Sequence, residues 1–133
     1  MNLILKLIIP GVLFINFSLI QDTELSKSIT RGKEVYNDFC AICHKPNGEG
    51  SEKIFPPLAK SDFLYKNREE SIRSVKFGQK GKIKVNGVEY NGTMPLPGLT
   101  DEEIVDVMNF IFFSWGNKSE KIVTLDEVKS VMK

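Results

Sequence analysis

The chain has 133 residues, a length that suits one small domain rather than two. Eighteen basic and seventeen acidic residues give a formal net charge of +1, so nothing favours nucleic-acid binding, which requires a basic stripe. With two cysteines and one histidine, the chain lacks the ligands for a four-coordinate zinc site.

Residues 1–21 form an apolar segment of the kind that directs export. Lys6 is its only charged residue, and a Pro-Gly pair at 10–11 interrupts its apolar run. This length and pattern predict a secretory signal peptide rather than a membrane span. No pair of small residues marks a cleavage site near Gln21, so an uncleaved anchor, attaching the protein to the membrane, is the alternative. In either case we expect the rest of the chain in the periplasm or the cell envelope.

Residues 22–28 are polar, and we expect them to be a flexible lead-in to the folded domain. Ser28 or Thr30 is a suitable cap for a helix that continues to about residue 40. Residues spaced by four share one face of this helix; they are Gly32, Tyr36 and Cys40. A glycine inside a helix costs about 1 kcal/mol relative to alanine. Gly32 therefore indicates the close approach of a second helix.

The sequence Cys40-Ala41-Ile42-Cys43-His44 contains every cysteine and the only histidine of the chain. C-x-x-C-H is the attachment signature of c-type haem. Two thiols three positions apart lie on one helix face, where both can add to the vinyl groups of one porphyrin. The next residue then places an imidazole nitrogen under the iron. We therefore predict one covalently bound haem c with its iron.

Two other interpretations of the cysteine pair are weaker. A disulfide between Cys40 and Cys43 would close a very short loop, and short loops stabilise a protein least. A thioredoxin-like redox pair lies in a βαβ pattern, which this sequence does not contain.

Residues 45–60 are rich in glycine and proline and are expected to form a loop. Pro56 or Pro57 leaves a carbonyl without a helical partner, and this carbonyl could accept the second ring N–H of His44. Phe55 and Leu58 could pack on the porphyrin, although an ordinary core position is the alternative for both.

A short helical turn is expected from residue 61, followed by a helix over residues 68–77 that Gly78 ends. Residues 82–90 alternate apolar and polar side chains around an Asn-Gly pair, which predicts a small β-hairpin. Thr100 and Glu103 form a capping box before a long helix. The apolar stripe expected on that helix comprises Ile104, Val105, Val107, Met108, Ile111, Phe112 and Trp115. Thr124 is expected to cap a last short helix, with Val128 and Val131 facing inward.

The second iron ligand is predicted to be Met94. It lies in a segment restrained by glycine and proline, whereas Met108 falls on the buried stripe and Met132 at the chain end. Lysines 80, 82 and 84 are weaker candidates because each would first have to lose a proton. Histidine–methionine ligation raises the haem potential and leaves no open site, which argues for electron transfer rather than catalysis.

Together these residues resemble the class I c-type cytochromes, in their small bacterial single-haem form, from about residue 29 to residue 115. The resemblance implies an all-α cytochrome c fold of four or five short helices around one covalent haem, with a β-hairpin before the methionine loop, in a domain over residues 29–133. It also implies that one of three phenylalanines packs against the N-terminal helix. The residues it assigns to the haem are Cys40, Cys43, His44, Met94 and Pro57, or Pro56, and the three phenylalanines are Phe110, Phe112 and Phe113.

The segments 90–95, 99–104 and 114–117 are similar to cytochrome domains that accompany copper nitrite reductases, terminal oxidases and periplasmic dehydrogenases. Redox proteins, a donor and an acceptor that the sequence does not identify, are therefore the expected partners. The main hypothesis is a one-electron carrier. The alternatives are a haem subunit fixed in an oxidoreductase complex, a haem sensor or enzyme with an exchangeable sixth ligand, and a haem-free thiol protein.

Overall fold

The structure is a computed structural model that describes residues 23–133. The signal peptide or anchor predicted for residues 1–21 therefore lies outside the described residues. The chain is helical at residues 23–39, and the elements that follow are α2 (Ala41–His44), α3 (Asp62–Lys66), α4 (Arg68–Phe77), β1 (Gln79–Val85), β2 (Val88–Met94), α5 (Asp101–Phe113) and α6 (Leu125–Ser130). This order confirms the predicted all-α architecture with one small hairpin.

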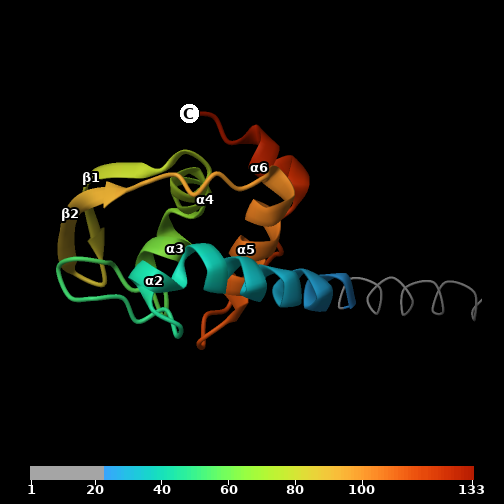
Figure 1. Cartoon of the computed structure of the whole chain (residues 1–133), viewed down its shortest axis with the longest axis horizontal. Helices are drawn as coiled ribbons and strands as arrows, with labels where there is room; N and C mark the ends of the chain where they lie inside the picture. Colours follow the sequence, from blue (N-terminus) through green and yellow to red (C-terminus); the bar gives the residue numbers. More distant parts are fainter. Residues whose placement is uncertain (1–22) are drawn as a thin grey trace, which may run out of the picture.

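The N-terminal helix crosses α5, and the two helices are drawn one over the other near the centre of the molecule (Figure 1). They meet at Gly32, whose missing side chain leaves room for the backbone of α5, as the sequence predicted. One turn further on, Tyr36 is fully buried, and its ring lies 5.3 Å from that of Phe110. Phe110 is therefore the aromatic partner among the three candidates.

The flexible lead-in expected at residues 22–28 is wrong for residues 23–28, which are helical. Ser28 does not cap this helix. Its side chain is buried and donates a hydrogen bond to Asp106 Oδ1 at 2.7 Å. Thr30 lies inside the helix and bonds back to the carbonyl of Ser26. Ser28 thus has its partner on α5, 78 positions away, which a local pattern does not reveal.

Helix α5 begins at the predicted capping box of Thr100 and Glu103. Both of its hydrogen bonds are present, because each residue's side chain accepts from the backbone amide of the other. The helix ends at Phe113, so the prediction that Trp115 continues its stripe is wrong. Trp115 takes a left-handed φ of 53°, which turns the chain back. Its ring then packs edge-on against Tyr36 at 5.0 Å and Phe110 at 5.2 Å, and this aromatic contact replaces another helical turn.

The hairpin is longer than predicted. Its two strands pair antiparallel from Val85 opposite Val88 to Gln79 opposite Met94. The turn at Asn86-Gly87 has positive φ at both residues, as two-residue hairpin turns require. Met94 is consequently the last residue of β2 and not a loop residue, which corrects the sequence prediction.

The short helix α6 begins at Thr124, whose hydroxyl accepts a hydrogen bond from the Glu127 amide as predicted. Val128 is fully buried and Val131 almost so, and α6 packs against α5. Among the helices of residues 23–133, none combines the length and the apolar character needed to cross a membrane.

Candidate functional site

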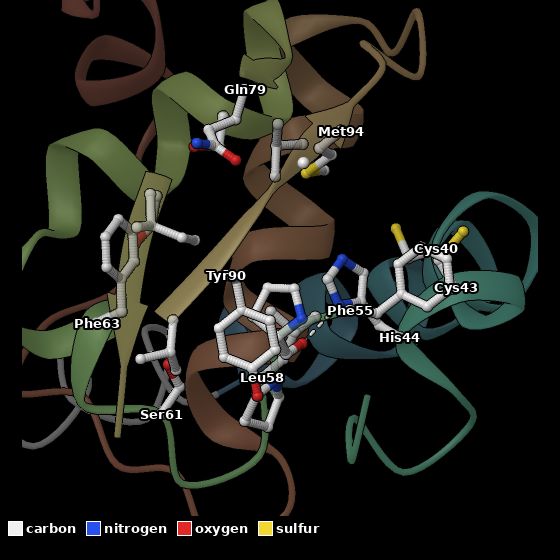
Figure 2. A pocket seen from close by; sticks show the side chains of 18 of the residues that line it. Cys40, Cys43, His44, Phe55, Leu58, Ser61, Phe63, Gln79, Tyr90 and Met94 are labelled. Atoms are coloured by element: carbon white, nitrogen blue, oxygen red, sulfur yellow. Dashed lines mark hydrogen bonds between the residues drawn. The ribbon is translucent and has the colours of Figure 1, made fainter. Parts of the chain in front are cut away.

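One cavity of about 390 Å³ lies between α2, α3, α4, the hairpin and α5, and all seven predicted site residues line it (Figure 2). These residues are Cys40, Cys43, His44, Phe55, Pro57, Leu58 and Met94. The volume is within the range of sites that enclose a small molecule or a cofactor. Segments more than 50 residues apart in the sequence therefore meet at one place.

The two cysteines are placed by a single turn of backbone. The chain leaves the N-terminal helix at Cys40, and the amides of Cys43 and His44 both bond to the Cys40 carbonyl, at 3.2 and 3.0 Å. Both thiols are free, so the structure gives no support to the disulfide interpretation. Burial, with a smaller contribution from Cys43, raises the pKa of the Cys40 thiol to about 11.

His44 is held by a backbone carbonyl. Its Nδ1 lies 2.9 Å from the oxygen of Pro56, which can only accept, so Nδ1 carries the proton. Its Nε2 therefore presents a lone pair, and this edge of the ring faces the cavity (Figure 2). Burial lowers the pKa of His44, against a smaller opposing effect of the hydrogen bond, so the imidazole is neutral.

The proline that holds His44 is Pro56, whereas Pro57 lines the cavity wall. Pro56 rather than Pro57 meets His44 because of a β-bridge in which Ser51 and Phe55 exchange both backbone hydrogen bonds, at 2.8 and 2.9 Å. The bridge folds the loop back toward α2, so the first carbonyl after it meets the imidazole. Sequence reasoning left this choice open because the two prolines are adjacent and locally equivalent.

Met94 reaches the cavity from the opposite side. Its sulfur and the His44 ring face each other across the same space (Figure 2). The hairpin fixes the position of Met94, because Met94 pairs with Gln79 at the end of the hairpin farthest from its turn. A thioether and a neutral imidazole on facing walls, two free thiols at the edge and an apolar lining form a donor set that fits haem c.

Tyr90 and Ser61 are among the cavity residues that sequence reasoning did not assign to the site. Tyr90 lies on β2 four positions before Met94, and the two-residue period of a strand places both on one face. That alternation could have indicated Tyr90. Ser61 comes directly before α3 and lines the cavity, but no local pattern distinguishes it from a surface serine.

Comparison with known proteins gives a consistent result. The sequence model of the family described as "Cytochrome c" matches residues 29–112, more than half of the chain. Cytochrome c-552 of Thermus thermophilus is 40% identical over 109 residues, which cover 75% of this chain and 82% of that protein. The cytochrome c subunit of alcohol dehydrogenase (quinone) of Gluconacetobacter polyoxogenes is 32% identical over 111 residues, 73% of this chain and 21% of that subunit. The gluconate 2-dehydrogenase cytochrome c subunit of Pantoea cypripedii is 31% identical over 122 residues, 85% and 28% of the two chains.

Proposed function

Because this chain belongs to the cytochrome c family, which binds haem c covalently, we propose that it transfers single electrons in the cell envelope, and that His44 and Met94 are the residues that would hold its iron. The observation that carries the proposal is the placement of these two side chains on facing walls of the cavity that the two thiols border. When bound, haem c supplies a one-electron iron couple.

The chain's own residues prepare the site for this group. Cys40 and Cys43 would each contribute one thioether bond. The carbonyl of Pro56 holds His44 in the tautomer that offers Nε2, so no proton has to leave when the ring binds a metal. The sulfur of Met94 is uncharged and is presented by a strand rather than by a mobile loop.

Two ligands from the chain would leave no open position for oxygen or a substrate. The same ligands would serve both oxidation states, so little would have to move when an electron enters or leaves. The largely apolar lining would keep water from the iron. Electron transfer is therefore the activity that this arrangement supports best.

The decisive experiment replaces Met94 by alanine. Met94→Ala should keep the haem, lose the near-infrared sulfur-to-iron band, lower the reduction potential and allow the reduced protein to bind carbon monoxide, which the unaltered protein should resist. Met108 is a matched control, because it lines the same cavity and is almost fully buried. Met108→Leu should preserve the band and the potential. An unchanged spectrum and potential in Met94→Ala would exclude Met94 as the ligand.

A second candidate role is a haem subunit held in an oxidoreductase complex. Relatives of both kinds match this chain, a cytochrome c-552 and the cytochrome c subunits of two dehydrogenases. Purification from membranes of the native cell separates the roles. A carrier should leave its partners on dilution, whereas a subunit should remain in a complex whose composition does not depend on concentration.

A further inference from the structure

Tyr36 connects the crossing of the N-terminal helix and α5 to the residue that follows His44. Its ring is fully buried and packs against Phe110 and Trp115, at centroid distances of 5.3 and 5.0 Å. Its hydroxyl donates a hydrogen bond of 2.6 Å to the backbone carbonyl of Lys45. Burial, the main cause, raises the pKa of the Tyr36 hydroxyl above its ordinary value, so this group remains a donor at neutral pH. A phenylalanine could supply the ring packing, so the hydroxyl has a separate role.

Lys45 has a backbone conformation that residues with a side chain rarely adopt. Its φ of 64° and ψ of 161° lie in a region that is essentially restricted to glycine. A lysine stays in such a conformation only where the surrounding groups hold it there. Two hydrogen bonds to the Lys45 carbonyl do so, one from the Tyr36 hydroxyl and one from the Gly48 amide at 3.0 Å. Tyr36 therefore helps to hold a strained residue directly after His44.

The conformation of Lys45 directs the part of the loop that returns to His44. The Gly50 amide donates to the His44 carbonyl at 3.0 Å, and a Cβ on Gly50 would lie 2.8 Å from the Pro56 carbonyl oxygen. The same Pro56 oxygen bonds to His44 Nδ1 at 2.9 Å (Figure 2). A change of φ at Lys45 would displace the chain up to Gly50, and with it the Pro56 carbonyl, relative to the imidazole.

We propose that the hydroxyl of Tyr36 positions the iron ligand His44, because by fixing Lys45 it strengthens the hydrogen bond made by His44 Nδ1. The proposal rests on the haem and the His44 ligation of the proposed function, but not on ligation by Met94. A carbonyl that accepts the Nδ1 proton makes the opposite ring nitrogen a better electron donor to a metal. A better donor stabilises the ferric state more than the ferrous state, so the Tyr36 hydroxyl lowers the reduction potential.

The test replaces Tyr36 by phenylalanine in the holoprotein, which keeps the ring and removes only the hydroxyl. The His44 Nδ1 proton, observed by proton NMR of the reduced protein, should exchange with solvent about tenfold faster, because one hydrogen bond that restrains the loop is lost. The reduction potential should rise, because a less firmly bonded imidazole donates less to the ferric iron. If either the exchange or the potential stays unchanged in Tyr36→Phe, the proposal is overturned.

Tyr65→Phe is the matched control. The Tyr65 hydroxyl is also hydrogen-bonded to the backbone, since it accepts from the Lys118 amide at 2.9 Å, but that amide belongs to the segment after α5. This variant should leave the His44 exchange and the potential unchanged. Equal changes in Tyr65→Phe and Tyr36→Phe would overturn the assignment to Tyr36.

Lys45→Gly tests whether the effect of Tyr36 passes through Lys45. Glycine adopts the observed φ and ψ without the strain that a side chain brings, so residue 45 no longer needs the Tyr36 bond to hold it. Tyr36→Phe should therefore change the exchange and the potential much less in Lys45→Gly protein than in the unaltered protein. Equal effects in the two backgrounds would overturn the route through Lys45. A merely structural role of Tyr36 would lower stability without moving the Nδ1 exchange or the potential.

A failure of the proposed function is recognised separately. The mass of each variant reports on haem attachment, and hyperfine-shifted ring protons of His44 in the oxidised protein report on its bond to the iron. The absence of these shifts in the unaltered protein would overturn the His44 ligation and this inference together. Their presence, with an unchanged potential in Tyr36→Phe, would overturn this inference alone.

Discussion

The backbone carbonyl of Asp106 occupies the place where a side chain of residue 32 would stand. A Cβ built on Gly32 lies 1.9 Å from the Asp106 oxygen and 2.4 Å from its carbonyl carbon. The N-terminal helix and α5 are therefore in backbone contact at their crossing. This contact sets the position of the N-terminal helix, and with it the place where Cys40 leaves that helix at the edge of the cavity.

Gly32→Ala should destabilise the folded haem protein strongly. The new Cβ would overlap the backbone oxygen and carbon of Asp106, which cannot move without moving α5. The two helices must therefore separate and lose their packing. Overpacking of this kind costs about 3 kcal/mol or more, against which the better helix propensity of alanine returns about 1 kcal/mol. Denaturant unfolding of the holoprotein measures the difference.

Gly92→Ala is the matched control. A Cβ on Gly92 meets nothing within 4 Å, and its backbone is not left-handed. Gly92 lines the cavity, so a side chain there adjoins the cofactor site, but this variant should lose far less stability than Gly32→Ala because no backbone stands in its way. Equal unfolding midpoints for Gly32→Ala and Gly92→Ala would show that the helices can part at no cost, which would contradict the contact described here.

The features that the sequence predicted correctly depend on neighbouring residues. The capping box at Thr100 and the end of α4 at Gly78 are set by groups within four positions of each other, and so is the Asn-Gly turn. The C-x-x-C-H motif is local in the same sense. Side-chain geometry over one turn of chain is enough to determine such elements.

The features that the sequence did not predict depend on contacts between distant segments. Asn117, whose contacts no local pattern predicts, donates from its amide to the carbonyls of Leu58 and Ile111 and accepts from the Lys60 amide. It thereby ties the loop that carries Leu58 to the end of α5. The burial of Ser28 against Asp106, 78 positions away, has the same origin. No periodicity records such pairings, because each involves a single residue whose partner is chosen by the tertiary fold.

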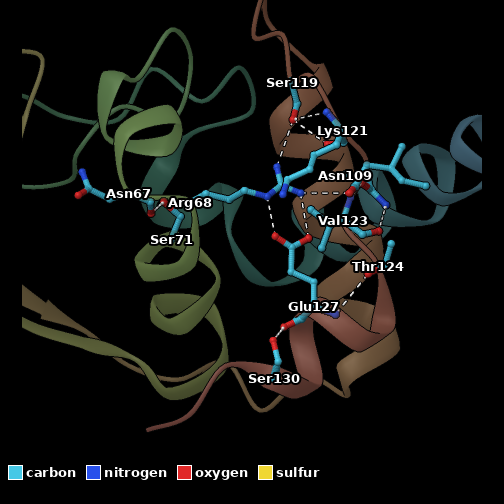
Figure 3. A network of polar contacts seen from close by, with 11 residues as sticks. Asn67, Arg68, Ser71, Asn109, Ser119, Lys121, Val123, Thr124, Glu127 and Ser130 are labelled. Atoms are coloured by element: carbon cyan, nitrogen blue, oxygen red, sulfur yellow. Dashed lines mark hydrogen bonds and ion pairs between the residues drawn. The ribbon is translucent and has the colours of Figure 1, made fainter.

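Arg68 and Glu127 should show a large energetic coupling. Two nitrogens of Arg68 donate to the two carboxylate oxygens of Glu127, at 2.6 and 3.0 Å, and join α4 to α6 (Figure 3). The same guanidinium bonds to Ser119 and to the Ile122 carbonyl and lies 4.7 Å over the Phe112 ring. A double-mutant cycle with Arg68→Met and Glu127→Gln should give a coupling of about 1–3 kcal/mol.

The ion pair between Arg73 and Glu69 serves as the comparison. It also lies on α4, but the Glu69 side chain is 69% exposed. Its coupling, measured by the same cycle, should not exceed about 0.5 kcal/mol. Equal couplings for the two pairs would mean that the enclosed setting of Arg68 contributes nothing.

Lowering the pH should reduce the free energy of unfolding, in part through protonation of Glu127. The hydrogen bonds from Arg68 hold the pKa of Glu127 below its ordinary value, in spite of some burial that acts the other way. In the unfolded chain this carboxyl has a pKa of about 4.3, so on acidification the unfolded state takes up the proton first. The contribution of Glu127 is therefore complete above that pH and is lost as the pH falls through the lower, folded-state pKa. The free energies of unfolding of the unaltered protein and of Glu127→Gln should converge at acid pH, and a constant gap would contradict this assignment.

Gly78 should control how Met94 is presented. It ends α4 with a φ of 80°, and a Cβ there would lie 2.8 Å from the Met94 carbonyl oxygen and 3.0 Å from the Leu96 amide nitrogen. An alanine at residue 78 would therefore be strained in its own backbone. Its side chain would also clash with the backbone of Met94, the residue proposed to hold the iron. We expect a weaker or shifted near-infrared sulfur-to-iron band and partial access of carbon monoxide to the reduced protein.

Gly87→Ala separates the contact with Met94 from backbone strain alone. Gly87 also has a positive φ, of 82°, and lies in the turn of the same hairpin, outside the cavity lining, and a Cβ there meets nothing within 4 Å. Both variants should lose a similar amount of stability, about 1 kcal/mol or more, because each places a side chain in the left-handed region. Only Gly78→Ala should alter the sulfur-to-iron band, because only its side chain meets the backbone of Met94. If the two variants changed the band equally, the clash between residue 78 and Met94 would not be the cause, and loss of hairpin stability would explain both changes.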